Sequence, residues 1–166
     1  MPKYSAGLLP YRVIESGALE VLLVHPGGPF WAKKDDGAWS IPKGEYEPAA
    51  EPDPLAVARR EFAEELGKQA PSGDHLQLGE LRQPSGKRIL AWSVQCDLDV
   101  TKVTSNSFEM EWPPRSGTMQ SFPEVDRAAW FSVDAARSKL LKGQEPFLDR
   151  LIEVLLPGNV THPGTS

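Results

Sequence analysis

The segment that most constrains the fold is residues 53–67, DPLAVARREFAEELG. Asp53 can accept a hydrogen bond from the first free amides of a helix, and a proline is well tolerated at the next position. Gly67 is placed to end that helix in a left-handed conformation. With 3.6 residues per turn, the apolar side chains gather on one face: Leu55, Ala58, Phe62 and Leu66. We therefore expect one amphipathic helix over residues 54–66.

Three carboxylates lie beside that apolar face: Glu61, Glu64 and Glu65. Like charges three or four residues apart on a helix repel by about 0.2–0.5 kcal/mol per pair. Carboxylates that border a core are costly unless they are paired. A solvated, Glu-rich face is the ordinary interpretation of such a cluster. The alternative is a site for a hard divalent cation such as Mg²⁺, which takes carboxylate oxygens and bridges to phosphates.

Strands are predicted on both sides of this helix, because apolar runs alternate with turns rich in glycine and proline. The expected strands are residues 4–13, 18–25, 39–41, 76–82, 87–98, 107–112 and 127–131. Two further helices are expected, one over 133–141 and one from Pro146 onward. This order predicts an α/β fold in which helices cover both faces of a mixed sheet.

The length of 166 residues suits one domain, which we expect to span residues 1–158, with a disordered tail over 159–166. A net charge of −5 argues against binding to long nucleic acids or to a membrane surface. Cys96 is the one cysteine, so no disulfide forms within the chain, and we expect a reducing, cytoplasmic location. The sequence does not indicate an oligomeric state.

The segment from Gly44 to Gly67 contains glycine, arginine and glutamate residues in a characteristic order. Gly44, followed later by REFAEELG from Arg60, resembles the signature of the Nudix hydrolases, which is Gly, five residues, Glu, seven residues, then Arg-Glu-apolar-x-Glu-Glu-x-Gly-apolar. The second half departs from it at the last position, where Lys68 replaces an apolar residue. The preceding WSIPKGEYEP also resembles the family.

The loop inside this signature is longer than the family pattern. Gly44 and Arg60 are sixteen residues apart here and fourteen apart in the family. The position six residues after Gly44 is Ala50, which cannot serve as the first glutamate. Glu51 is the nearest acid and takes that place if the loop bulges.

The resemblance implies an α/β/α sandwich that hydrolyses a nucleoside diphosphate linked to another group, with Mg²⁺ or Mn²⁺ as cofactor. The implied metal site comprises Gly44, Glu61, Glu64 and Glu65. Glu64 and Glu65 are also implied in catalysis, Glu64 either as a ligand or as the base that deprotonates the water, and Arg60 would orient a glutamate through a salt bridge. Some members take their general base from another loop, for which Glu124 is the candidate and Glu109 and Glu111 are weaker ones.

The sequence constrains the identity of the substrate less than the type of bond that is cleaved. Residues 39–45 resemble the branch of the family that cleaves dinucleoside polyphosphates. Lys43, Lys33 and Lys34 are candidates for neutralising phosphates, and Trp39, Phe30 or Trp31 for stacking on a base. Solvent-facing lysines and core aromatics are the alternative interpretations. The alternative functions are a pyrophosphatase for ordinary or oxidised nucleoside triphosphates, and a nucleotide-binding module with weakened catalysis.

Overall fold

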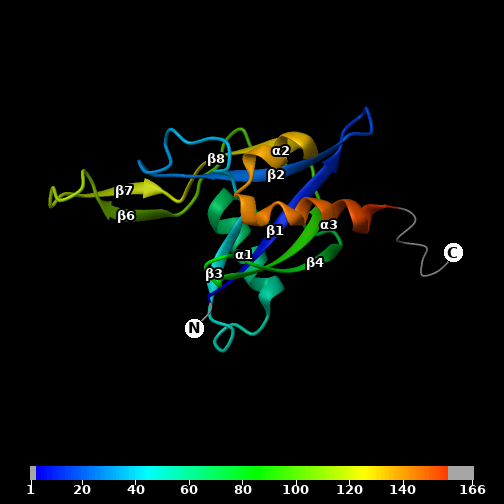
Figure 1. Ribbon diagram of the computed structural model, residues 1–166, viewed down its shortest axis with the longest axis horizontal. Helices are drawn as coiled ribbons and strands as arrows, with labels where there is room; N and C mark the ends of the chain where they lie inside the picture. The colour runs from blue at the N-terminus through cyan, green and yellow to red at the C-terminus, as the bar shows by residue number, and fades with distance from the viewer. Residues whose placement is uncertain (1–2, 157–166) are drawn as a thin grey trace.

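The computed structural model describes residues 3–156, which form a central sheet, a separate hairpin and three α-helices (Figure 1). In chain order the elements are β1 (Tyr4–Val13), β2 (Leu19–Pro26), β3 (Lys43–Tyr46), α1 (Pro54–Leu66), β4 (His75–Arg82), β5 (Arg88–Gln95), β6 (Ser107–Glu111), β7 (Met119–Pro123), β8 (Val125–Ser132), α2 (Val133–Lys139), the 3₁₀ helix η1 (Lys142–Gln144) and α3 (Pro146–Leu155). The expected tail over 159–166 lies outside the described residues.

The six-stranded main sheet is mixed, as predicted, with the order β4-β5-β1-β2-β8 and β3 paired with β1. β1 pairs in parallel with β5 along one edge. Its other edge is shared between two antiparallel partners, β3 along residues 4–7 and β2 along residues 11–13. This shared edge places the start of β3 against the middle of the sheet.

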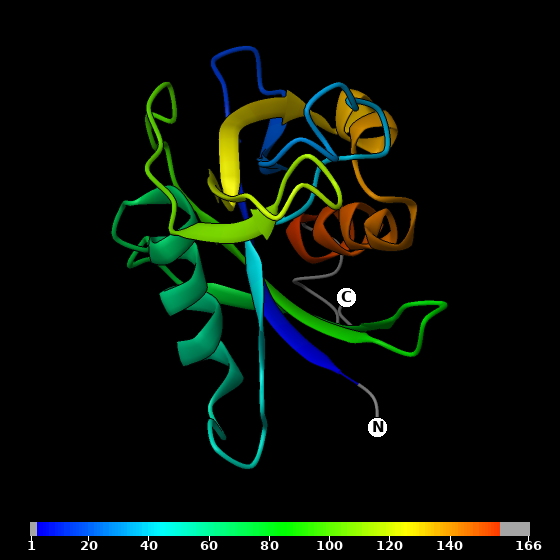
Figure 2. The ribbon, with the colours of Figure 1, turned by 90° about the vertical axis from the view of Figure 1, so that its left-hand side faces the viewer.

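Alternating side chains of β2 supply two cores, one on each face of the sheet. Val21 and Leu23 join the core beneath α2 and α3, whereas Leu22 and Val24 join the core beneath α1. Figure 2 shows α1 on one side of the sheet and α3 on the other. The prediction of an α/β/α sandwich is confirmed. No helix among residues 3–156 is both long enough and apolar enough to cross a membrane.

The predicted helix over 54–66 is confirmed with its expected ends. Asp53 accepts a hydrogen bond from the amide of Ala56 at 3.3 Å. Gly67 has a φ of 68°, and its N–H donates to the carbonyl of Ala63 at 2.8 Å. Hydrogen bonds at its two ends therefore define where α1 begins and ends, and so where its three glutamates lie relative to the sheet.

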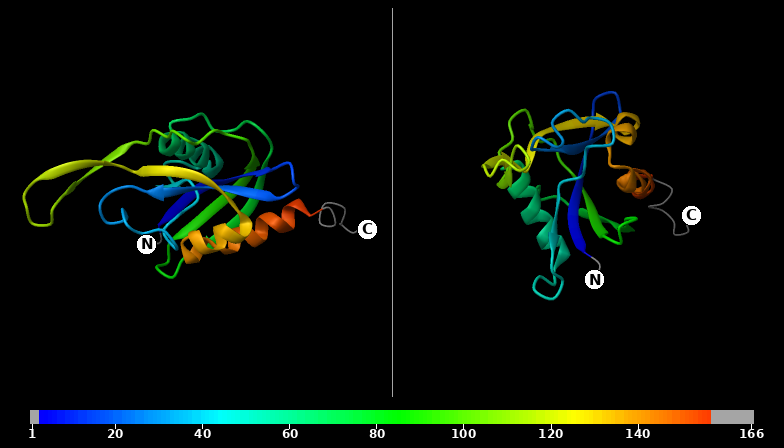
Figure 3. Two further views of the ribbon diagram at one scale, coloured as in Figure 1. Left: turned by 90° about the horizontal axis from the view of Figure 1, so that it is seen from above. Right: turned by 60° about the vertical axis from the view of Figure 1, so that its left-hand side comes forward.

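Several predicted boundaries are corrected by long-range pairing. Residues 39–41 form only isolated bridges, and the strand lies instead at β3, where polar residues pair with the free edge of β1. The strand expected over 87–98 ends at Gln95, and α2 ends at Lys139 because Leu140 is extended. β7 was not predicted. It pairs with β6 to form a hairpin that extends from the main body (Figure 3).

Candidate functional site

The candidate site lies where strand β3 packs against helix α1. A Cβ atom placed on Gly44 would lie 2.0 Å from both Cδ and Oε1 of Glu61. Glycine is therefore required at this position if the Glu61 carboxylate is to rest against the backbone of β3. The predicted proximity of Gly44 and Glu61 is thus present in the structure.

Glu65 occupies the deepest position of the acidic group. Its Oε1 accepts a hydrogen bond from the backbone amide of Lys43 at 3.2 Å. Burial raises the pKa of Glu65 to about 8, against the opposing effect of the nearby Lys43 cation. Burial also lowers the pKa of Lys43, with a further contribution from the charge of Lys87. Both groups are held in a poorly solvated place where a charged ligand would interact strongly.

Glu124 joins the helix acids from the junction between β7 and β8. Its backbone carbonyl accepts from the amide of Gly27 at 3.0 Å, and its own amide donates to the carbonyl of Asn106 at 2.8 Å. The pKa of the Glu124 carboxyl is raised first by burial and then by the negative charges of Glu61 and Glu64. The structure therefore brings together carboxylates that are about sixty residues apart in the sequence.

Glu109 and Glu111, the weaker candidates, lie on the hairpin instead. Both are exposed on β6. The carboxylate of Glu111 accepts from the amide of Gly117 at 2.7 Å, at the far end of the hairpin. Of the three candidate bases, Glu124 is the one that the structure places beside the helix acids.

Arg60 pairs with several acids at once. Its guanidinium lies 3.1 Å from Glu61 and 3.7 Å from Glu64, and it also contacts Glu51. The hydrogen bonds that Arg60 donates to Glu51 and Glu61, led by the one to Glu51, raise the pKa of its guanidinium. The longer loop thus turns back far enough for Glu51 to reach Arg60, with the amides of Ala50 and Glu51 both bonded to the carbonyl of Glu47.

The donor set can be tested for its fit to a divalent metal. In the range 3–156, no three or more His, Cys, Asp or Glu side chains are already arranged as a metal-binding group. The carboxylates of Glu61 and Glu64 are instead paired with Arg60. The acids at this point still supply oxygen donors alone, beside a glycine that leaves room, which is the chemistry that Mg²⁺ and Mn²⁺ favour. The chemistry of these residues therefore fits such an ion.

Two adjoining hollows lie beside the acids. The smaller, about 160 Å³, is lined by Lys43, Glu65, Glu124 and Trp31 among others. The larger, about 270 Å³, is here called the aromatic hollow, and its lining includes Phe30, Trp31, Phe108, Met110 and Glu124. Because they share Trp31 and Glu124, the aromatic hollow opens directly next to the carboxylates.

The predicted substrate-binding residues differ in their placement. Trp39 is only 3% exposed, and its Nε1 donates to Asp35 at 2.8 Å, so the prediction that it stacks on a base is wrong. It packs in the core, edge-on to neighbouring rings. Lys33 and Lys34 lie on the 27–38 loop, and both are exposed. The Lys34 ammonium lies 4.1 Å from the centre of the Phe30 ring, on the rim of the aromatic hollow.

Phe108 and Met110 were missed by sequence reasoning. They alternate with exposed residues along β6, so a strand with two apolar residues on one face could be recognised in the sequence. The residues against which that face packs could not be recognised from the sequence. In the structure Phe108 packs so closely on Gly28 that a Cβ there would lie 2.9 Å from its ring.

Comparison with known proteins is consistent with this geometry. The family model of the NUDIX domain matches residues 11–152. The NUDIX domain of Shewanella oneidensis NrtR, solved with ADP ribose, has a TM-score of 0.62 at 15% identity, over 94% of this chain and 90% of that one. An Ap4A hydrolase from C. elegans gives 0.60 at 20% identity, over 92% and 97%.

A MutT protein from Methanosarcina mazei Go1 gives a TM-score of 0.55 at 18% identity, over 91% of this chain and 94% of that one. At these identities the likeness concerns the fold alone. A search of curated protein sequences finds no significant match.

Proposed function

This chain belongs to the NUDIX domain family, which makes it a hydrolase of phosphoanhydride bonds, and we propose that it cleaves a nucleotide substrate with the help of Mg²⁺. Mn²⁺ is the expected substitute because it accepts the same oxygen ligands. The observation that carries the proposal is the meeting of Glu124 with the acids of α1. An acidic cluster assembled from two distant segments is costly to the fold unless a cation or a reaction uses it.

Glu61, Glu64 and Glu65 would hold the metal, together with the backbone of Gly44. When bound, the metal supplies Lewis-acid stabilisation of phosphate oxygens and lowers the pKa of water. Arg60 acts beside these residues rather than on the substrate. Its contacts at 3.1 Å and 3.7 Å fix the orientation of Glu61 and Glu64.

Glu124 is proposed as the general base that accepts a proton from the attacking water. Its raised pKa supports this role, because a base works best when its pKa approaches the working pH. It lines both hollows and so lies between the proposed metal ligands and the proposed nucleotide site. Glu65 is the alternative base, since burial raises its pKa further.

The phosphates and the base of the nucleotide are assigned to the two hollows. Lys43 lines the smaller hollow beside Glu65, where its ammonium can offset phosphate charge. Phe30 and Trp31 offer ring surfaces at the aromatic hollow, and Phe30 is 63% exposed. Stacking of a base on an aromatic side chain contributes about 1–3 kcal/mol, so an exposed ring at this place is a strong candidate.

Dinucleoside polyphosphates are the first substrate class proposed. Lys33 and Lys34, on the loop above the aromatic hollow, could follow a phosphate chain longer than two groups. Nucleoside triphosphates, ordinary or oxidised, are the second class, because the aromatic hollow of about 270 Å³ would accept one base equally well.

Product analysis by ion-exchange chromatography tests the proposal. The protein is incubated with Mg²⁺ or Mn²⁺ and a panel of diadenosine tetraphosphate, nucleoside triphosphates, oxidised guanine triphosphate, ADP-ribose and nucleoside diphosphate sugars. Release of a nucleotide from the first compound, abolished by EDTA, supports the first class, whereas release of pyrophosphate from a triphosphate supports the second. Nucleotide binding by calorimetry without any cleavage would favour a binding module and contradict the proposed hydrolysis.

A further inference from the structure

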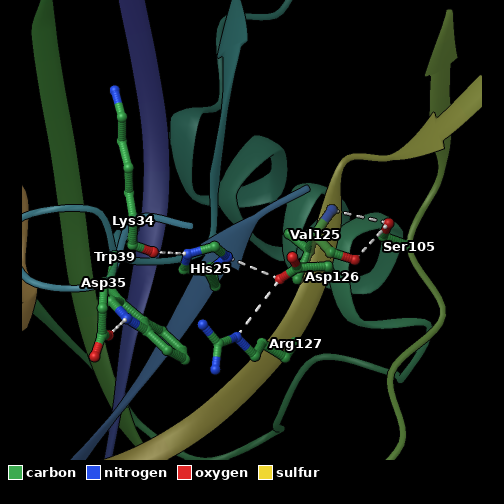
Figure 4. A network of polar contacts seen from close by, with 8 residues as sticks. All are labelled: His25, Lys34, Asp35, Trp39, Ser105, Val125, Asp126 and Arg127. Carbon is green, nitrogen blue, oxygen red and sulfur yellow. Dashed lines mark hydrogen bonds and ion pairs between the residues drawn. The ribbon is translucent and has the colours of Figure 1, made fainter. Parts of the chain in front are cut away.

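His25 is the second-last residue of β2 and its side chain is fully buried, with both ring nitrogens facing hydrogen-bond acceptors (Figure 4). Nδ1 lies 2.9 Å from Oδ1 of Asp126 on β8, and Nε2 lies 2.6 Å from the backbone carbonyl oxygen of Lys34. An imidazolium ring donates both hydrogen bonds, whereas a neutral ring donates one of them. The ring therefore links β8 to the middle of the 27–38 loop.

The charged groups around His25 come from β8 and from the 27–38 loop. Asp126 contacts the ring from β8, and the guanidinium of Arg127 lies 3.9 Å from the same carboxylate oxygen. Trp39 packs edge-on against the imidazole at 5.2 Å between ring centres, and its Nε1 is held by Asp35. Asp126 is thus held between the imidazole and Arg127, so its carboxylate fixes the orientation of the buried ring.

The linked loop forms one wall of the aromatic hollow. Its ends are anchored by the backbone, with the amide of Gly27 bonded to the Glu124 carbonyl and the amide of Gly37 to the Ser138 carbonyl, each at 3.0 Å. In its middle, the Lys34 amide donates to the Trp31 carbonyl at 2.9 Å. A bond at the Lys34 carbonyl therefore also restrains the turn that carries Trp31.

We propose that His25 is a positioning residue, which holds Trp31 and its loop in place for nucleotide binding while Asp126 orients its ring. It does not touch the substrate, since it lies buried behind the loop. A binding wall that is ordered in advance saves the free energy of ordering it when the ligand arrives. Loss of the link should lower the fraction of molecules whose loop is correctly placed, and the affinity for the nucleotide should fall in the same proportion. The kinetic part of this inference rests on the proposed function.

Two substitutions test the link. Asp126→Ala removes the acceptor of Nδ1 at a side chain that is 34% exposed, and His25→Gln changes the buried ring itself. We expect KM to rise about tenfold with kcat within about twofold, as for loss of one hydrogen bond to a charged group. Asp126→Asn keeps an acceptor oxygen in place and should recover most of the KM. If His25→Gln fails to fold, Asp126→Ala still decides the question.

Asp149→Ala is the matched control, because it breaks a 2.7 Å contact with Arg137 at α3, away from the 27–38 loop. Hydrogen exchange measured by mass spectrometry gives a second reading that needs no substrate. In Asp126→Ala, amides of residues 27–38 should exchange about tenfold faster while those of α3 are unchanged. Unchanged exchange in 27–38 would overturn the proposal, as would an equal rise in KM in Asp149→Ala. If no substrate is cleaved, the proposed function fails, and the exchange experiment alone decides the role of His25.

Discussion

Substitution of Gly44 by alanine isolates the contact on which the proposed metal site depends. The new Cβ would lie 2.0 Å from Cδ and Oε1 of Glu61, and ordinary contact begins at 3.4 Å. The Glu61 carboxylate must therefore retreat by about 1.4 Å, since the backbone of β3 is held by its pairing with β1. A misplacement of about 1 Å can cost about 100-fold in rate, so we expect kcat/KM to fall by about two orders of magnitude.

Stability should change far less than activity. The clashing atoms are the end of a flexible side chain that can turn toward solvent, so the cost should lie at the low end of the 1–3 kcal/mol typical of overpacking. For a chain of this size, about 1 kcal/mol lowers the melting temperature by about 2–4 °C. Gly73→Ala is the matched control, because its new Cβ would meet nothing closer than 3.8 Å.

The assay is steady-state hydrolysis at saturating metal, with thermal melting in parallel. Gly44→Ala and Glu61→Gln act through the same carboxylate, so the double variant should be no slower than Glu61→Gln alone. Full activity in Gly44→Ala would refute the reasoning, and so would additive losses in the double variant. A collapse of the melting temperature would show that the glycine serves folding instead.

Three further predictions concern other parts of the molecule. Glu65→Gln should abolish turnover while thermal melting shows a stability that is unchanged or higher, because burial opposes a charge there; activity equal to the wild type would contradict its role. Phe30→Ala should raise KM about tenfold at constant kcat, from the loss of about 1–3 kcal/mol of stacking, and an unchanged KM would remove the aromatic hollow from the binding site. The pKa of His75 is lowered from 6.5 by burial and by Arg59, so the unfolded chain binds the proton more readily. The stabilising contribution of neutral His75 is therefore complete above pH 6.5 and is lost as the pH falls below it. The difference in the free energy of unfolding in urea between the wild type and His75→Gln should accordingly fall with the pH below 6.5, and a difference that does not depend on pH would contradict this role.

Local chemistry in the sequence was enough to predict α1. Its cap at Asp53, its terminal Gly67 and its apolar spacing all act within one helix, so no distant contact is needed to read them. The strand β3 could not be predicted in the same way. Its residues Lys43–Tyr46 are mostly polar, and they form a strand because β1 leaves that part of its edge unpaired by β2.

The residues of the candidate site also differ in whether local sequence or long-range packing determines their position. The helix acids follow from the helical periodicity and Gly44 from the resemblance to the family signature, but the position of Glu124 depends on how the hairpin leads into β8. Trp39 shows the opposite error, because an aromatic residue next to a phosphate-binding candidate has no local feature that reveals its burial. Its environment is set by His25 and Phe131, which come from other strands.

The longer loop before α1 bears on how a cation could enter the site. Arg60 lies 3.1 Å from Glu61 and 3.7 Å from Glu64, so a divalent ion at the proposed metal site would compete with its charge. Glu51 offers Arg60 a third partner that is not among the proposed metal ligands. If a divalent ion binds Glu61 and Glu64, Arg60 still keeps Glu51 as an acidic partner, so its charge remains paired.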